Sequence, residues 1–246
     1  MNTNLKETDT GIEETLRKTS QYLMPGKAVE QGREAAYQIY PATTIGANKI
    51  FNGYTSLAQW IVAQKQVVID GYVGVFWDRV QSGIEKCLKE QGLSASWIDT
   101  ADFLKSTADI ETLVKPFLGE EQSVWGTKCT LSLADLYHTE KSDAQTRDSG
   151  ADINIIIGPG AALLNPDAAL LYLELPKNEL QFRMRAGSIN NLGAGELVEP
   201  FRMYKRFYFV DWVLLNKHKK SILSRIEAIV HPQWLLYCSE LISCDC

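Results

Sequence analysis

A short apolar run, Val67–Ile69, leads into Gly71 and Gly74, and apolar residues then recur at helical spacing from Val80 to Leu88. The run has the length of a buried strand, whereas the spacing after the glycines is that of a helix with one apolar face. This stretch predicts a strand, a glycine-containing turn and a helix. We expect the rest of the fold to be organised around this unit.

Further short apolar runs alternate with helical periods along the chain. Ile153–Ile157 and Ala169–Leu175 predict two more buried strands, and Ala95–Ile98 predicts a shorter one. Helical spacing predicts helices over residues 107–118, from Pro176 to Met184, and over residues 201–229. Strands that alternate with helices form a parallel sheet covered on both faces, with right-handed crossovers. The expected fold is therefore a three-layer α/β arrangement around a parallel sheet.

The sequence divides into three segments. Residues 1–44 form a polar N-terminal arm with a helix expected over Ile12–Met24. Residues 45–230 contain the alternating strands and helices, and residues 231–246 form a short divergent tail. With 246 residues, 45% of them hydrophobic, the chain can bury the core of one domain. We expect one α/β domain with two appended segments.

Charge and cysteine content exclude several classes of function. The net charge of −5 gives no general attraction to nucleic acid or an anionic membrane. The mixed basic and aromatic segment Lys205–Phe209 has helical spacing that buries its rings, which also argues against nucleic acid.

No stretch has the length of a membrane span or a secretory signal, so a cytoplasmic location is expected. Five cysteines make no disulfide framework, and Cys244 with Cys246 supplies only half of a tetrahedral metal site.

The turns after three predicted strands are expected to meet at one edge of the sheet. Ligands of parallel α/β sheets bind beyond the carboxyl ends of the strands. Gly71, Asp99 and Gly158 each follow or end a predicted strand, so they point to a single site.

The central turn has the architecture of a phosphate-binding loop but lacks most of its residues. In the pattern G-x-x-x-x-G-K-[ST], backbone amides and a lysine hold phosphate at a helix N-terminus. Gly71 matches the first glycine, whereas Phe76, Trp77 and Asp78 stand in place of the second glycine, the lysine and the hydroxyl residue. Loss of the lysine removes a charge-assisted hydrogen bond worth about 1.5–3 kcal/mol. Asp78 lies in the first helical turn, where the helix dipole stabilises its carboxylate by about 0.3–1 kcal/mol. The carboxylate therefore occupies the positive end of the helix that a phosphate would otherwise use.

The order of these motifs resembles the small-molecule P-loop kinases of the uridine kinase type. The segments that carry the resemblance are GYVGVFWD, the run from Ile98 to Leu104, IIIGPGAALL, and LYLELPKNELQFRMRAG. The resemblance implies a phosphate loop at Gly71, an acidic base at Asp99 or Asp102, and lid arginines at Arg183 and Arg185. The lysine of the family has no counterpart.

The candidate residues also have plainer interpretations. Asp99 and Asp102 are catalytic candidates, but Asp99 or Thr100 is equally suited to cap a helix. The candidates for binding a nucleotide or phosphate are Gly71, Gly74, Asp78, Gly158, Arg183 and Arg185. Arg183 and Arg185 can equally belong to a solvent-exposed helix end. Gly158 and Gly160 can equally form a tight turn. Asp211 and His218 share an apolar stripe and are interpreted as a buried polar pair or a helix edge.

A second resemblance covers residues 45 to about 230. The runs QKQVVIDGYVGVFWDRV, VWGTKCTLSLADLY, ADINIIIGPGAALL, LPKNELQFRMRAGSINNLG and MYKRFYFVDWVLLNKHK resemble the N-terminal part of long Bacteroidetes proteins classed as type I mannose-6-phosphate isomerases. In that family the isomerase chemistry is that of a zinc cupin downstream of this module. Residues 231–246 do not resemble the expected continuation, which indicates a truncation or a shifted reading frame.

The residues and the resemblances together favour a kinase-like module with no catalytic machinery of its own. We expect no cofactor in this chain, because zinc belongs to the downstream cupin and His138, His218 and His231 form no ligand cluster. The expected partner is a cupin-type isomerase domain, in cis or in trans. The alternatives are residual binding of a nucleotide with Mg²⁺ or of a sugar phosphate, weak kinase activity, and mannose-6-phosphate isomerase activity in this chain.

Overall fold

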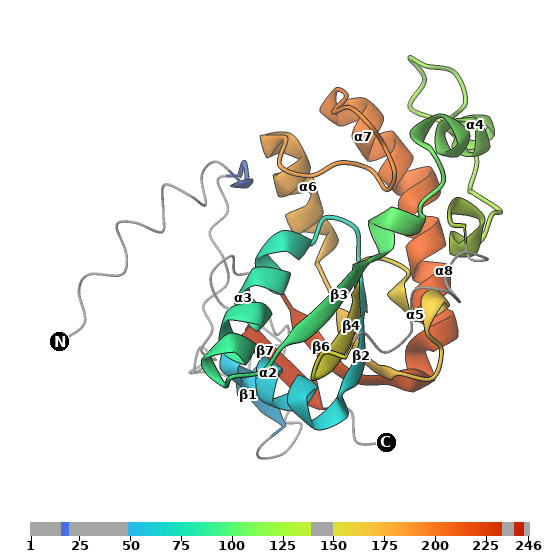
Figure 1. Ribbon diagram of the computed structural model, residues 1–246. Coiled ribbons are helices and arrows are strands. Elements are labelled where there is room, and N and C mark those ends of the chain that lie inside the picture. Colours follow the sequence, from blue (N-terminus) through green and yellow to red (C-terminus); the bar gives the residue numbers. More distant parts are fainter. Residues whose placement is uncertain (1–15, 20–48, 139–149, 233–238, 244–246) are drawn as a thin grey trace, which may run out of the picture.

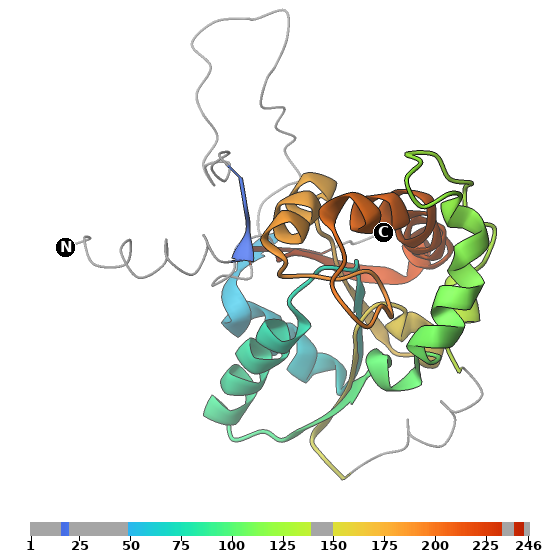
Figure 2. The same cartoon turned by 90° about the horizontal axis from the view of Figure 1, so that it is seen from above.

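The computed structural model describes residues 16–19, 49–138, 150–232 and 239–243. These residues form one sheet with helices on both of its faces (Figure 1). Helices α2 (Gly53–Gln64) and α3 (Trp77–Glu90) lie together on one face, and α4 (Thr107–Leu118) and α8 (Trp212–Ile222) lie on the other (Figure 2). The three-layer α/β fold expected from the sequence is confirmed.

Over the described residues the sheet has seven strands in the order β1-β7-β6-β5-β2-β4-β3. In chain order they are β1 (Ile50–Asn52), β2 (Gln66–Gly71), β3 (Ala95–Asp99), β4 (Ile153–Ile157), β5 (Ala169–Leu173), β6 (Ile226–His231) and β7 (Ser239–Ser243). The five strands from β6 to β3 are parallel, and β7 is antiparallel to both β6 and β1. The strand before the glycine turn, β2, therefore lies between β5 and β4, where Ile69 pairs with Ile157.

Shorter helices connect the strands. They are η1 (Thr100–Phe103), η2 (Leu133–Leu136), α5 (Ala161–Leu164), α6 (Lys177–Ala186), α7 (Pro200–Arg206), the π-helical turn η4 (Phe207–Asp211) and η5 (Leu223–Arg225). The strands β2, β4 and β5 read as continuous apolar runs because helices cover both of their faces. Val68, Ile69 and Leu171 are completely inaccessible to solvent, which places the core along these central strands.

The predicted helix over residues 201–229 is wrong at its C-terminal end. The helical segment stops at η5, and residues 226–231 form the parallel strand β6 instead. Ile226, Ala228 and Val230 are buried, whereas Glu227 between them is exposed. This two-residue alternation is that of a strand, and the helical spacing of Ile222, Ile226 and Ile229 concealed it. The helix before it is also interrupted, by the π-helical turn η4.

The helix predicted over residues 107–118 is confirmed as α4, and Pro116 lies in its last turn without ending it. Gly92, with a φ of +73°, follows the end of α3 as a C-terminal cap. No helix in the described ranges is long and apolar enough to cross a membrane. Most of the helix predicted over Ile12–Met24, and Cys238, Cys244 and Cys246, lie outside the described residues.

The sheet continues beyond residue 230. Strand β6 extends to His231, and β7, within the segment expected to be a tail, pairs with both β6 and β1. The N-terminal segment enters the described structure only as Leu16–Thr19, which lies beside α6. Both features determine what surrounds the glycine turn.

Candidate functional site

The segment from Gly71 to Phe76, here called the glycine loop, joins the central strand β2 to helix α3. All of its residues from Gly71 to Val75 are buried. Gly71 is required by close packing, since a Cβ there would lie 2.6 Å from the carbonyl oxygen of Leu173 on β5. At the other end of the loop, the amide of Trp77 already donates a hydrogen bond to the carbonyl of Val75. The loop is therefore a tightly packed connection, and its first helical amide is occupied.

Helix α6 packs directly onto the glycine loop. Gly74 has a φ of +87°, and a Cβ on it would lie 2.3 Å from a methyl carbon of Leu180 on α6. The carbonyl oxygen of Gly74 accepts a hydrogen bond of 2.8 Å from Nη1 of Arg183, also on α6. The guanidinium carbon of Arg183 lies 4.2 Å from the centre of the Phe76 ring, a cation–π contact. Gly74 and Phe76 are thus both held by α6.

Arg183, one of the predicted lid arginines, is completely buried. Its side chain also donates to the carbonyl oxygen of Pro232 at 3.1 Å and to Glu179 at 3.2 Å. Burial lowers the pKa of Arg183, and the charge of Glu179 opposes that shift. Arg185, two residues further along, is exposed. The two arginines therefore lie in opposite environments, and the Arg183 guanidinium is committed to holding the loop and the end of β6.

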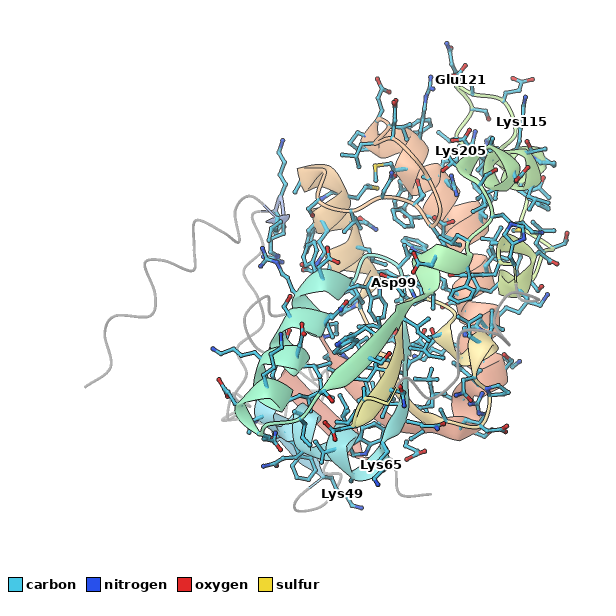
Figure 3. The ribbon with its side chains drawn as sticks, in the orientation of Figure 1. Lys49, Lys65, Asp99, Lys115, Glu121 and Lys205 are labelled. Carbon is cyan, nitrogen blue, oxygen red and sulfur yellow. The ribbon has the colours of Figure 1, made fainter. Side chains whose placement is uncertain are left out.

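A cavity of about 370 Å³ lies at the carboxyl ends of the central strands, beside the glycine loop. One wall is the loop and the start of α3, from Val73 to Asp78, and the second is the turn Asp99–Ala101 after β3. The third wall is the segment Ser188–Gly193 after α6, and Leu104, Tyr137 and Pro159 complete the lining. Asp99 lies at the end of β3 on this edge of the sheet (Figure 3). The turns after β2, β3 and β4 thus meet at this edge of the sheet, but of Gly71, Asp99 and Gly158, which were expected to share the site, Asp99 alone is among the lining residues.

The cavity is acidic. Asp78 and Asp99 are the charged side chains among its described lining residues, and none of those residues is a lysine or an arginine. Burial raises the pKa of Asp99, and the negative charges of Asp102 and Asp78 raise it further. The amide of Ala101 lowers the pKa of Asp99, because it donates a hydrogen bond of 2.8 Å to the carboxylate, which caps η1. Asp99 thus both caps a helix, as one of its interpretations required, and faces the cavity.

Two of the remaining candidates are near this cavity without lining it. Asp102 is exposed on η1. Gly158, with a φ of +124°, follows β4, and a Cβ on it would lie 2.1 Å from the hydroxyl oxygen of Thr100. The close approach of the turns after β4 and β3 therefore needs a glycine at this position.

A buried polar centre, which the sequence analysis did not identify, lies at the end of β2. Asp70, at the end of β2, is completely buried and accepts hydrogen bonds from three backbone amides, those of Gly71, Gly160 and Ala162, at 2.6–2.9 Å. Its second oxygen lies 2.7 Å from Nε2 of His218 on α8. Burial, and secondarily the negative charge of Asp70, raise the pKa values of Tyr137 and Tyr172. An internal carboxylate thus occupies the amides of the turn after β4.

Asp211 and His218 are buried and have polar partners, as one interpretation of the sequence expected, but they do not pair with each other. His218 pairs with Asp70, and Asp211 accepts a hydrogen bond of 2.7 Å from Asn191. Asp211 is the last residue of the π-helical turn η4, and the regular helix α8, which carries His218, follows it. Asn191 belongs to the third wall of the cavity, so Asp211 supports the site from behind.

No metal centre is visible in the described part of the chain. Within those residues no group of three or more histidine, cysteine, aspartate or glutamate side chains is arranged to hold an ion. Cys87 and Cys129 are free thiols, and burial raises the pKa of Cys129.

The strand β2 lies in the middle of the five parallel strands and is followed by a glycine loop and a helix, which defines the class of this protein as a three-layer α/β fold with P-loop-like topology. Residues 53–237 match a sequence family described as a domain of unknown function, DUF8485, and the chain belongs to that family. No curated protein matches the chain.

Two solved structures are similar to part of this chain at low sequence identity. One is provisionally assigned as a fructose transport system kinase from Silicibacter sp. TM1040, with 14% identity and a TM-score of 0.43 over 68% of this chain and 94% of the other. The other is provisionally assigned as a uridine kinase from Bacillus stearothermophilus, with 14% identity and a TM-score of 0.40 over 72% of this chain and 96% of the other.

Proposed function

We propose that this chain is a kinase-like module that does not transfer a phosphoryl group. The observation that carries the proposal is the chemistry of the cavity at the glycine loop. A triphosphate needs cationic or amide donors, whereas the charged lining residues that the structure describes are Asp78 and Asp99. Both carboxylates repel an anion at the position where a phosphate would bind.

The packing of the loop supports the same proposal. The side chains of Phe76 and Trp77 occupy the positions at which the phosphate-loop pattern has a glycine and a lysine, and both line the cavity. The buried guanidinium of Arg183 is bonded to two carbonyl groups and to Glu179, so it is engaged with the protein itself. These residues do not fit a nucleoside triphosphate with its magnesium ion, and we derive no chemical step through either.

Ligand-dependent thermal unfolding and a phosphoryl-transfer assay test this proposal. A ligand at about 100 times its Kd adds about 2.7 kcal/mol to stability, which in a chain of this length raises Tm by about 5–10 °C. With millimolar ATP and Mg²⁺ we expect no such rise and no release of ADP. A rise in Tm together with ATP turnover that Asp78→Ala abolishes would refute the proposal. Asp102→Ala is the matched control, since it removes a neighbouring charge that does not line the cavity.

The same unfolding assay separates the alternative of sugar-phosphate binding. Mannose 6-phosphate should leave Tm unchanged, because its phosphate meets the same two carboxylates. A dose-dependent rise with mannose 6-phosphate, but none with mannose, would support residual phosphate binding instead. Fructose 6-phosphate formed by the purified chain with added zinc would support isomerase activity.

We further propose that the module acts in association with a cupin-type mannose-6-phosphate isomerase domain, in cis or in trans. Its support is the similarity of five long sequence runs to the N-terminal part of such isomerases. Mixing the purified chain with a recombinant cupin domain from those proteins should give one co-eluting species in size-exclusion chromatography. Separate elution at concentrations of about 100 μM would contradict an association of useful strength.

A further inference from the structure

Residues Leu16–Thr19, here called the strap, lie across helix α6. The backbone amide of Lys18 donates to the carbonyl oxygen of Phe182 at 2.9 Å. Two residues earlier, the carbonyl oxygen of Leu16 accepts a hydrogen bond of 2.6 Å from the hydroxyl of Ser188, just beyond the end of α6. The strap is thus bonded to α6 near its middle and immediately after its end.

The third contact of the strap is an ion pair with a buried carboxylate. Nε and Nη2 of Arg17 donate to the two oxygens of Glu179 at 3.0–3.2 Å, and its guanidinium lies 5.2 Å from the centre of the Phe182 ring. Glu179 is 1% exposed, and on its other side it accepts a hydrogen bond from Arg183. One carboxylate is therefore shared by two guanidinium groups, one from the strap and one from α6.

These contacts connect the strap to two walls of the cavity. Arg17 binds Glu179, Glu179 binds Arg183, and Arg183 binds the carbonyl oxygen of Gly74 in the glycine loop. Ser188, bonded to the strap, is the first residue of the cavity wall Ser188–Gly193. The far part of that wall is fixed independently, because Leu192 accepts a hydrogen bond of 2.6 Å from Arg206. The strap is therefore placed to control the near part of the wall and the loop.

We infer that the strap is a clamp that holds α6 on the glycine loop and so sets the width of the cavity beside it. Arg17, at 10% exposure, is the outermost of the three charged side chains, since Glu179 is 1% exposed and Arg183 is completely buried. Without the Arg17 guanidinium, Glu179 loses one of the two cations that fix its position, and Arg183, which binds both Glu179 and Gly74, is less firmly positioned. Arg17 is a positioning residue for the loop.

Hydrogen exchange on the full chain tests this inference. Arg17→Ala removes one charge-assisted contact, worth at least about 1.4 kcal/mol, so the amides of the glycine loop should exchange about tenfold faster. Lys18→Ala is the matched control, because it removes the adjacent positive charge and keeps the backbone bond to Phe182. We expect it to leave loop exchange within about twofold of the wild type. Faster exchange confined to α6, with residues 72–76 unchanged, would overturn the inference.

A second variant tests the route through Glu179. In a Glu179→Gln background, Arg17→Ala should change loop exchange by less than about twofold, because the shared carboxylate is already gone. An undiminished tenfold effect in that background would contradict the proposed route. If Arg17→Ala does not fold, Arg17→Lys keeps one charge and loses the two-pronged contact. Arg17→Lys should then accelerate loop exchange by an intermediate factor, and exchange equal to that of the wild type would count against the clamp.

Discussion

Replacing Arg183 by alanine tests whether this arginine is a structural support of the glycine loop. The side chain is fully buried and contacts Glu179, the carbonyl oxygens of Gly74 and Pro232, and the ring of Phe76. Its removal leaves two carbonyl groups without this donor. Glu179, at 1% exposure, then loses the guanidinium of Arg183 and keeps its ion pair with Arg17.

The expected loss of stability follows from these contacts. Removing one partner of a buried ion pair costs about 3–5 kcal/mol, because the other charge stays buried with less compensation. The individual hydrogen bonds are not added to this figure, since they belong to the same network and water can enter the space. A domain of ordinary stability, about 5–15 kcal/mol, would still fold. Arg183→Met, which keeps much of the side-chain volume, separates the loss of charge from the loss of packing.

Urea unfolding of the wild type, Arg183→Ala and Arg185→Ala measures the effect. At constant m-value, the lower urea midpoint of Arg183→Ala should correspond to a loss of about 3–5 kcal/mol in the free energy of unfolding. Arg185→Ala, on the same helix but exposed, should lie within about 0.5 kcal/mol of the wild type. A loss of less than about 1 kcal/mol for Arg183→Ala would refute a structural role.

Three further predictions concern the loop and the cavity. Gly74→Ala should destabilise the fold by about 2–4 kcal/mol, because the position has a positive φ and the new Cβ would lie 2.3 Å from Leu180. Urea unfolding measures this loss, and an unchanged stability would contradict the described loop. Asp78→Asn should lower the pKa of Asp99, observable as an earlier carboxyl titration by NMR, and an unchanged titration would show that the two charges do not interact. Because burial raises the folded-state pKa of Asp99 above 3.8, its protonated form favours the fold at low pH, and this contribution is lost as pH rises through the folded pKa. Asp99→Asn should therefore reduce the fall in stability over that pH window, and an identical pH profile would refute the assignment.

The central part of the fold could be predicted because its signals are local. Val67–Ile69 and Ile153–Ile157 are short apolar runs bounded by turn residues, and burial on both faces of a parallel sheet requires that pattern. The location of the site followed from topology alone, since the carboxyl ends of parallel strands share one edge. The strand β6 was missed because Ile222, Ile226 and Ile229 fit a helical period as well as a strand.

The polar supports of the site could not be predicted, because each depends on residues far apart in the sequence. Asp70 lies 148 residues from His218, and Arg17 lies 162 residues from Glu179. A carboxylate at the end of an apolar strand and a histidine on an apolar helix are the only local signs of the first pair. An arginine side chain is usually exposed to solvent, so the sequence alone predicts an exposed Arg183. Its burial is possible because three segments of the chain supply partners for the guanidinium group.

The measurement that tests the central claim most directly is isothermal titration of the full chain with ATP and Mg²⁺. If Asp78 and Asp99 exclude phosphate from the cavity, no binding should appear, corresponding to a Kd weaker than about 1 mM. Saturable binding with a Kd of about 10 μM or tighter, weakened by Gly74→Ala and unaffected by Asp102→Asn, would place a nucleotide at the glycine loop and contradict the account.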